Sequence, residues 1–475
     1  MRAVKSSAAL AFLSLAFAAT AGAQGEGRVP AASPVVVPAS PQSYSGSVPL
    51  GTATAEPMAL SLKEALDRGL KQNLGAVLTG YGIGGARGQR WQDLANLLPN
   101  VRAQVSENAS QVNIAATFGF RFPGFPTIIG PFGYFASGFS LDQTLFSLSR
   151  INQARSGGAA LDAAKYSYDD ARDIIVLGVG NAYLLCVAGA ARVDTAVAQQ
   201  ATAQALYDLA SDQFKAGLAP AIDVLRAQTE LQSRKQQTIV ARNDYAKELL
   251  QLGRVIGLPP GQQVTLTDKA LYGPEPSLTV QTALDQAYAT RSDYKSARAT
   301  MRAAELAQRA ARSEYLPNIG FTGDYGIAGV TPNTTHGVYN ASVRLNVPVF
   351  EGNRVHGDVL VAQAAFNQAK AQFDNLRGQI DYDVRAAFLD LESAKERVGV
   401  ARINKDLADQ TLEQSQDRFR AGVTNNVEVV QAQDQVAAAN ESLISSLYSY
   451  DLARITLARA IGNAEMGVAE YLKGK

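Results

Sequence analysis

The chain has few of the residues that metal sites and thiol chemistry require. Its 475 residues include one cysteine and two histidines. A single cysteine excludes an intramolecular disulfide framework, and so few soft ligands argue against a structural zinc site. Net charge is also nearly absent, with 44 basic side chains against 43 acidic ones, whereas binding of nucleic acid needs a basic excess. We therefore expect no metal, no other cofactor, no nucleic-acid partner and no enzyme of the metal or thiol classes.

Long apolar runs are missing as well. Residues 1–23 have the layout of a secretory signal peptide, with two basic residues, an apolar run and then Ala21-Gly22-Ala23. That run is shorter than the ~20 residues of a membrane-spanning helix, and no later stretch is long enough. No cysteine follows the cleavage site to carry a lipid. Residues 24–58 are rich in Pro, Ser, Ala and Gly, which predicts a disordered leader.

The sequence is duplicated. The segment Leu60–Leu66 is echoed by Leu278–Leu284, and Leu98-Pro99-Asn100 by Leu316-Pro317-Asn318, both 218 residues later. These matches predict two structural repeats, residues 59–257 and 278–462, separated by a linker at 258–277 and followed by a tail at 463–475. The first repeat carries an additional segment from Phe118 to Phe135, which predicts a longer loop there.

Each repeat contains one long stretch without proline, from about Arg150 to Ala216 and from Gly352 to Ala421. Apolar and small residues recur along both at steps of three and four, which predicts coiled-coil seams. A 67-residue helix is roughly 100 Å long at 1.5 Å per residue. Two shorter helices, such as Leu60–Leu98 and Ile222–Val255, would together match that length.

The period changes to two after each Leu-Pro-Asn. We predict strands at 101–113 and 134–145 in the first repeat, and at 318–328 and 338–348 in the second. Each has an apolar and a polar face and is long enough to cross a bilayer as a tilted strand. Four strands cannot close a barrel in lipid, so closure would need two, three or four copies. A soluble sheet packed on the helices is the alternative.

Two further signals mark helical turns. Phe214-Lys215-Ala216-Gly217 and Phe419-Arg420-Ala421-Gly422 each precede an Ile-Gly pair by the same 40-residue spacing. Together with the Leu-Pro pairs and the Leu60–Leu66 segment, these signals resemble the TolC-like outer-membrane efflux family, over about Leu60 to Gly462. The resemblance implies a mainly α fold with β: long antiparallel helical hairpins forming an α-barrel, plus four transmembrane strands per chain in a trimeric 12-stranded β-barrel.

The resemblance also implies a function and partners. The chain would be a passive export duct of a tripartite efflux or type I secretion system, in the outer membrane of a Gram-negative cell and extending into the periplasm. Its partners would be two further copies in a homotrimer, outer-membrane lipid, a periplasmic adaptor protein and an inner-membrane transporter. A periplasmic coiled-coil spacer or surface structural protein without channel activity is the alternative.

The two helix-hairpin turns, near 217–223 and 422–428, are the candidate site. Gly217 and Gly422 stand where each long helix should end in a left-handed residue. Asp223 and Glu428 follow in the first turn of the return helix, where an acid offsets the helix dipole, and this plain role is the alternative for both.

The resemblance gives the second turn a role as the periplasmic entrance. It places Glu428 in an acidic ring and Asp223 in a supporting position. Gln431 occupies a position that is acidic in some members, which argues against a double ring. Phe419 and Thr424 complete the expected entrance.

Three other patterns in the sequence could indicate a site elsewhere. The segment Gly80–Gly85 fits a dinucleotide fingerprint but interrupts a helical stretch, so we predict a helix break or bend there and no cofactor. The acids of Asp169-Asp170 and Asp381-Tyr382-Asp383 fall in long helical runs, which predicts solvated helix faces. His336 and His356 flank the last strand and are expected at the surface.

Overall fold

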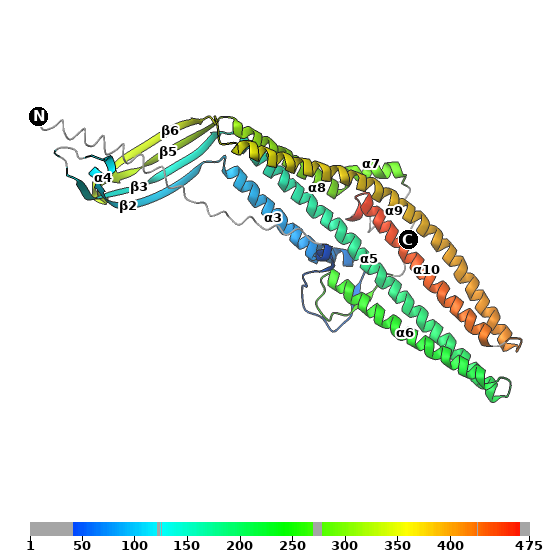
Figure 1. Ribbon diagram of the computed structural model, residues 1–475. Coiled ribbons are helices and arrows are strands. Elements are labelled where there is room, and N and C mark those ends of the chain that lie inside the picture. The colour runs from blue at the N-terminus through cyan, green and yellow to red at the C-terminus, as the bar shows by residue number, and fades with distance from the viewer. Residues whose placement is uncertain (1–40, 121–123, 125, 269–277, 425, 466–475) are drawn as a thin grey trace. The chain divides into compact units, whose positions relative to one another are not determined.

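A computed structural model describes residues 41–120, 124, 126–268, 278–424 and 426–465. The described residues all belong to one compact unit. The signal peptide and the leader up to residue 40 lie outside the described residues. The elements in chain order are 3₁₀ helix η1 (Pro41–Ser45), β1 (Met58–Leu60), α2 (Leu62–Gln72), α3 (Leu74–Ala95), β2 (Asn100–Asn113), α4 (Ile114–Phe118), β3 (Ile128–Phe146), α5 (Leu148–Lys215), α6 (Ala221–Val255), β4 (Val264–Leu266), α7 (Val280–Thr290), α8 (Ser292–Arg312), η2 (Ser313–Tyr315), β5 (Asn318–Gly329), η3 (Pro332–Thr334), β6 (His336–Asn346), α9 (Arg354–Arg420) and α10 (Asn426–Ala460) (Figure 1).

The four long strands form one open antiparallel sheet in the order β2-β3-β5-β6. Because paired residues share a face, the register aligns Ala103, Phe139, Tyr325 and Tyr339 in one row across the sheet. This apolar face is exposed in the single chain: Tyr339 is 83% exposed, Tyr325 71% and Val105 70%. β2 and β6 are the outer strands of the described sheet.

Two strands differ in length from the sequence prediction. β3 begins at Ile128, ahead of the predicted 134, so much of the segment expected as a loop from Phe118 to Phe135 is strand. The extension pairs with the far end of β2, where Ile128 lies opposite Asn113. β6 covers His336–Asn346, against the predicted 338–348, and stops before Pro348, which lacks the N–H needed for pairing.

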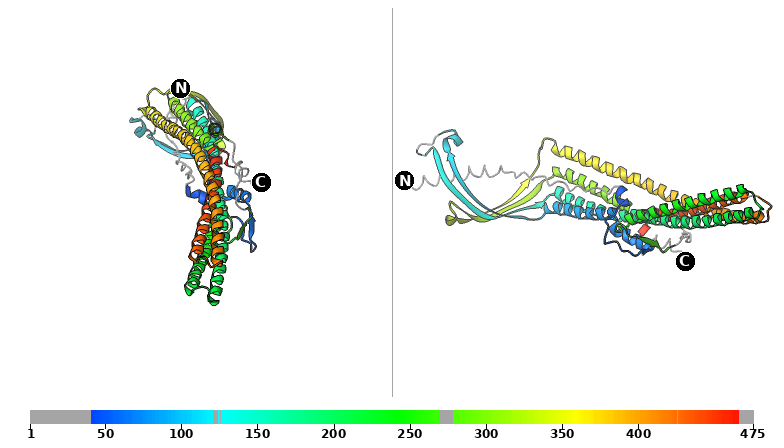
Figure 2. Two further views of the ribbon diagram at one scale, coloured as in Figure 1. Left: turned by 90° about the vertical axis from the view of Figure 1, so that its right-hand side faces the viewer. Right: turned by 90° about the horizontal axis from the view of Figure 1, so that it is seen from below.

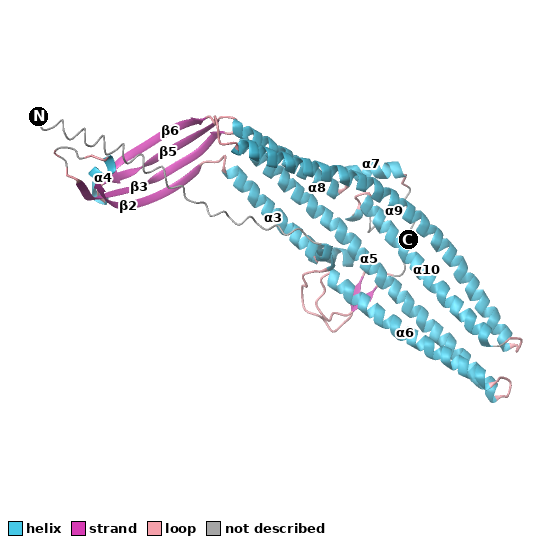
Figure 3. Ribbon diagram, in the orientation of Figure 1, coloured by secondary structure: helices cyan, strands magenta, loops and turns pink. Residues whose placement is uncertain are grey.

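The helices follow the strands as one layer, in the order α3-α5-α8-α9 near the sheet and α6-α5-α10-α9 farther along (Figure 3). α5 packs against α3 and α8 near the sheet and against α6 and α10 farther along, and α9 packs against α8 and α10. The end of α6 lies beside the start of α3, and Asn73 Nδ2 donates to the Val255 carbonyl there at 3.4 Å. In the second repeat Arg291 Nη1 donates to the Ala460 carbonyl at the same distance. Pairs of short helices therefore run alongside one long helix in each repeat (Figure 2).

The seam predicted along α9 is buried from Ile380 to Val398. Along α9 the residues at steps of three and four are almost fully buried: Ile380, Val384, Ala387, Leu391, Ala394 and Val398. They form one core with α7 and α10. One stretch of α5 is apolar enough, by length and composition, to cross a membrane as a helix, and 56% of it is buried. Its side chains pack in the core of the first repeat, which accounts for that composition.

The helix break lies at Asn73, so the break predicted at Gly80–Gly85 is wrong. Asn73 has an extended backbone with ψ 134°, and its side chain accepts from Gly75 N to begin α3. The helix continues through Gly80, Gly82 and Gly84, because each glycine costs only about 1 kcal/mol in a helix. Arg291 makes the equivalent break between α7 and α8.

The predicted disorder of the leader is wrong for its last part. Val48 N donates to the Gln72 carbonyl at 2.9 Å, and Leu74 N donates to the Gly46 carbonyl at 3.0 Å. Farther on, β1 pairs in parallel with β4, which lies inside the predicted linker. The start of the predicted tail also belongs to the fold, since Ala464 is fully buried. Backbone pairing with distant residues orders these segments, which their composition does not show.

Two acids expected on solvated faces lie instead between helices. Asp170 Oδ1 on α5 is 3.7 Å from Arg459 Nη2 on α10, and Asp383 Oδ2 on α9 is 3.2 Å from the buried Arg291. Burial is the main cause that raises the pKa of Asp170 to about 6, with a further contribution from Asp293. His336 and His356 are exposed, and Asp169 is solvated.

The raised pKa of Asp170 predicts a pH effect on stability. Above the ordinary pKa of 3.8 the unfolded chain releases this proton, while the folded chain retains it up to about pH 6. Raising the pH through this window therefore lowers the free energy of unfolding, by about 1–2 kcal/mol between pH 5 and pH 7.5. Denaturant unfolding of the detergent-solubilised protein at several pH values measures it. The Asp170→Asn variant should show a smaller pH dependence than the wild type, and an equal dependence would contradict the assignment.

Candidate functional site

Both long helices end in the same left-handed turn. Gly217 has φ 75° and Gly422 has φ 72°. Gly422 N donates to the Phe419 carbonyl at 3.0 Å, and Val423 N donates to the Arg418 carbonyl at 2.9 Å. This pair of hydrogen bonds is the Schellman motif, which satisfies the last helical carbonyls. The repeated Phe-x-Ala-Gly segments thus reverse the chain into α6 and α10.

A small apolar core holds the two hairpin turns together. Leu206 and Ala210 of α5, Ala227 of α6 and Val429 of α10 pack around Phe419, which is 5% exposed. Phe419, expected at the entrance, therefore lies between the helices and away from any open surface of the single chain. Its position continues the buried seam of α9 through Ser415, four residues before it, so an aromatic side chain there faces the neighbouring hairpin.

A polar contact also joins the two turns. Asn426 is fully buried, and its Nδ2 donates to the backbone carbonyl of Asp223 at 3.2 Å. Asp223 is 7% exposed, and its carboxylate lies 3.4 Å from Arg226. The structure therefore places Asp223 at the contact between the hairpins, and no pattern in the sequence identifies its partner Asn426.

Glu428 is the more accessible of the two acids, with a side chain 39% exposed. Its Oε2 accepts from Thr424 Oγ1 at 2.5 Å, and its Oε1 lies 3.4 Å from Arg418 Nε. Thr424 and Glu428, both predicted at the entrance, are therefore in contact. The contact of Glu428 with Arg418 was not predicted from the sequence. A basic residue one position before Phe419 is the signal that could have identified it.

Gln431 is exposed on the next turn of α10. It lines a shallow groove between α6 and α10 with Ile222, Leu225, Val427 and Val430. Farther from the turn, the buried Arg234 of α6 bonds Glu230 on its own helix and Asp434 on α10. This charged contact joins the hairpins about one turn beyond the groove.

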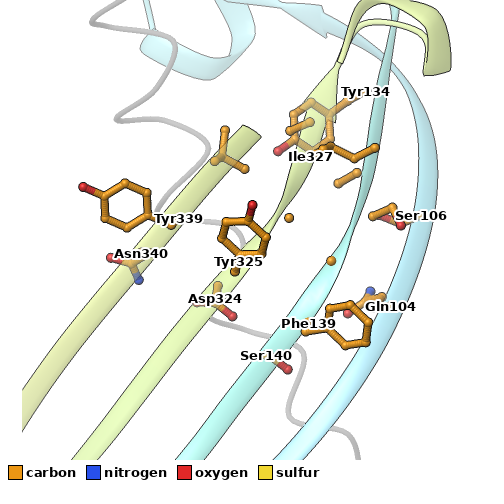
Figure 4. A pocket seen from close by; sticks show the side chains of 16 residues that line it. Gln104, Ser106, Tyr134, Phe139, Ser140, Asp324, Tyr325, Ile327, Tyr339 and Asn340 are labelled. Carbon is orange, nitrogen blue, oxygen red and sulfur yellow. The ribbon is translucent and has the colours of Figure 1, made fainter. Parts of the chain in front are cut away.

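The opposite end of the chain offers a polar surface on the sheet. Gln104, Ser140, Asp324 and Asn340, one from each strand, line a hollow against the sheet together with Phe139, Tyr325 and Tyr339 (Figure 4). The register pairs Ser140 with Asp324 and Asp324 with Asn340, so these polar residues alternate along the strands with the residues of the apolar row. The sheet therefore separates a polar from an apolar surface. No group of acidic, His or Cys side chains that could hold a metal ion occurs among the described residues.

The left-handed turn gives a test of Gly422. A Cβ at this position meets nothing within 4 Å, so the Gly422→Val variant would be strained by its backbone alone. We expect the turn to lose about 1–3 kcal/mol of local stability. Hydrogen exchange of the backbone amides of residues 422 and 423 measures this loss. The Gly378→Val variant, inside α9 with equally open space, is the matched control and should leave exchange at the turn unchanged. Equal exchange in both variants would contradict the strain.

Comparison with known proteins agrees with this geometry. The sequence profile of the family described as "Outer membrane efflux protein" matches residues 85–258 and 283–463. The chain is 20% identical to outer membrane protein TolC of Salmonella enteritidis, over 68% of each chain. It is 23% identical to the alkaline protease secretion protein AprF of Pseudomonas aeruginosa, over 66% of this chain and 67% of AprF.

Solved structures share the fold. The Campylobacter jejuni CmeC outer membrane channel superposes with a TM-score of 0.76 at 18% identity, over 87% of this chain and 89% of CmeC. The outer membrane protein VceC of Vibrio cholerae superposes with a TM-score of 0.72 at 18% identity, over 84% of this chain and 96% of VceC. The matched proteins are outer-membrane channels and export components, which makes this chain an export duct of the outer membrane and not an enzyme. The chain belongs to the outer membrane efflux protein family.

Proposed function

We propose that three copies of this chain close into one passive duct, with a 12-stranded β-barrel in the outer membrane and an α-barrel in the periplasm. The observation that supports closure is that the chain has open edges on two sides. β2 and β6 are the outer strands of the described sheet. α3 leads into β2, and β6 leads into α9, and both helices lie at the edges of the helical layer. Pairing β6 of one copy with β2 of the next would satisfy both edges, as lipid requires.

The sheet has the dimensions and polarity for a bilayer. β5 has 12 residues, roughly 40 Å of strand, and at a tilt of about 40° it would rise by about 30 Å, enough for an apolar band of ~25 Å. The exposed apolar rows would face lipid. The polar face that carries Gln104, Asp324 and Asn340 would then line the lumen.

The number of copies and the external partners come from the family. Six repeats arranged around one axis give 12 strands, and the family resemblance supports three chains over two or four. A periplasmic adaptor protein and an inner-membrane transporter would complete the export system, as the family resemblance implies. The name of AprF refers to protease secretion, so protein cargo and small-molecule cargo both remain within this proposal.

The turn of α9 and α10 would form the periplasmic entrance. Three copies of Glu428 around a narrow opening would attract cations and repel anions. Each Glu428 has Arg418 beside it, which offsets part of that field. Gln431 is exposed on the adjacent turn and contributes polarity without charge.

The duct is tested on the purified mature protein in detergent. We expect a trimer by light scattering and discrete ion conductance after insertion into planar bilayers. The alternative, a coiled-coil spacer or surface structural protein, requires no detergent and conducts no ions. A monomer that stays soluble without detergent and gives no conductance would contradict the proposed function.

The charge arrangement at the entrance predicts opposite effects of two variants. Glu428→Gln removes an acidic charge per copy and should reduce the preference for cations. Arg418→Gln removes the neighbouring basic charge and should increase that preference. Reversal potentials in salt gradients measure the cation preference of both variants. The ratio of cation to anion permeability should change by about twofold or more in each variant. Asp223→Asn is the control, because its carboxylate is largely buried and should leave selectivity unchanged. Shifts in the same direction, or a shift in Asp223→Asn alone, would overturn the assignment of the lining residue.

A further inference from the structure

The two helix breaks of this chain occupy equivalent positions but differ in charge. Arg291, at the break between α7 and α8, stands 218 residues after Asn73, at the break between α2 and α3. The side chain of Asn73 bonds backbone groups, including the Tyr44 carbonyl at 2.8 Å and Gly75 N at 2.9 Å. Arg291 instead donates to the carboxylate of Asp293 at 2.7 Å. The first break is therefore neutral and the second is ionic.

The second break is held against the end of α10. Thr290 Oγ1 donates to the Ile461 carbonyl at 2.7 Å, and Arg291 Nη1 donates to the Ala460 carbonyl at 3.4 Å. Gly462 follows in a left-handed conformation, and a Cβ there would lie 2.6 Å from Arg291 N. The backbone after α10 thus touches the backbone of the break, so a movement at the break must also separate this contact.

Two acids of α5 face the same place. Ser292 Oγ, at the first residue of α8, donates to Asp173 Oδ2 at 3.5 Å. Asp170 Oδ1 lies 3.7 Å from Arg459 Nη2 on α10. Residues three apart in a helix are neighbours on one face, where two like charges are unfavourable. The contact of α5 with both helices at the break therefore includes a pair of carboxyl groups.

Acidic groups outnumber basic ones around this pair. Arg172 of α5 binds Glu465 after α10, with Nε 2.9 Å from Oε2, and Asp383 of α9 lies 3.2 Å from Arg291. The groups that face the pair from the packed elements are Tyr44 of η1, Arg291 and Asp293 of α8, Arg459 of α10 and Glu465. Counted together with the pair, five carboxylates lie among three guanidinium groups. Protonation of the pair leaves three of each.

The local environment favours the protonated pair. Burial is the main cause that raises the pKa of Asp170 and of Asp173 to about 6. The charge of Asp293 adds to this effect at Asp170, and the charge of Asp170 adds to it at Asp173, while Arg459 lowers both pKa values. A carboxyl whose pKa is raised by packing binds its proton more tightly in the packed state than in an open one. A rise in pH through about 6 therefore weakens the packing.

We propose that the break between α7 and α8 is a hinge controlled by protonation. It packs firmly against α5 and α10 when Asp170 and Asp173 are neutral, and it loosens when both carry charge. The break at Asn73 keeps its packing at either pH, because Gly75 occupies the position of Asp293 and the bonds of Asn73 are to neutral groups. All of these groups belong to one chain, so this inference goes beyond the proposed function and does not depend on the number of copies in the duct.

Hydrogen exchange of the full-length mature protein in detergent tests the hinge. Exchange rates are measured at several pH values between 5 and 7.5 and divided by the intrinsic rate of each amide at that pH. The protection of residues 295–299, at the start of α8, should fall by about tenfold or more over this range. Residues 77–81, at the equivalent place in α3, are the internal control and should keep their protection. An equal change at both places, or no change at residues 295–299, would overturn the proposal.

A variant without the two charges should remove the effect. Asp170→Asn combined with Asp173→Asn is neutral at every pH, so its residues 295–299 should keep at pH 7.5 the protection that they have at pH 5. Asp169→Asn is the matched control, because Asp169 is exposed on the same helix, and it should retain the pH dependence of the wild type. A pH dependence that persists in the double variant would contradict the assignment of the pair.

Arg459→Gln separates protonation from a structural role. Loss of this positive charge should raise the pKa of both acids further, so the midpoint of the change in protection should move to higher pH. A structural role alone would lower the protection at every pH without moving the midpoint, and that result would overturn the proposal. A conducting trimer whose hinge does not respond to pH would overturn this inference and leave the proposed duct intact.

Discussion

The unpaired backbone of the two outer strands is the constraint on which this structure depends. In lipid, an unsatisfied N–H or C=O group costs several kcal/mol, so an open four-stranded sheet cannot remain open there. β2 and β6 are 14 and 11 residues long. Soluble proteins often protect an edge strand by making it very short or by placing charged side chains along it, and these two strands are long and carry few charges. Their apolar faces are also continuous with those of the inner strands. The proposed closure on further copies would satisfy the backbone and the apolar surface together.

The helices extend the same arrangement away from the membrane. α5 and α9 are single helices of 68 and 67 residues, and each is flanked by two shorter helices that meet at Asn73 or Arg291. The buried side chains of both breaks bond the carbonyls at the end of the adjoining helix, so each pair of short helices acts as one continuous partner for a long helix. At the far end, Asn426 and Phe419 join the hairpins through one hydrogen bond and one small apolar core. The two hairpin turns thus depend on few contacts, in contrast to the cores near the middle of the helices.

Much of this fold could be predicted because its helices and strands follow from the regular spacing of apolar residues in the sequence. The steps of three and four along α9 correspond to buried residues, and the alternation in β5 and β6 corresponds to one exposed apolar face. The features that could not be predicted depend on contacts between distant residues. The order of the last part of the leader comes from backbone hydrogen bonds of Val48 with Gln72 and of Gly46 with Leu74, and the helix break comes from the side chain of Asn73 and not from the glycines after it. Asp170 looked solvated because its partner, Arg459, is almost 300 residues away. At the candidate site, Gly217 and Gly422 could be located from the sequence, whereas the pairing of Glu428 with Arg418 required the fold of the turn.

The central claim is that the two edges of the chain close on one another in different copies. An equal mixture of nitrogen-labelled and carbon-labelled chains, assembled in lipid bilayers, allows solid-state NMR transfer between backbone nitrogen and carbon only across chain boundaries. The account predicts such signals from β2 and β6 and none from β3 and β5. Signals from the inner strands, or an absence of signals from both edges, would contradict it.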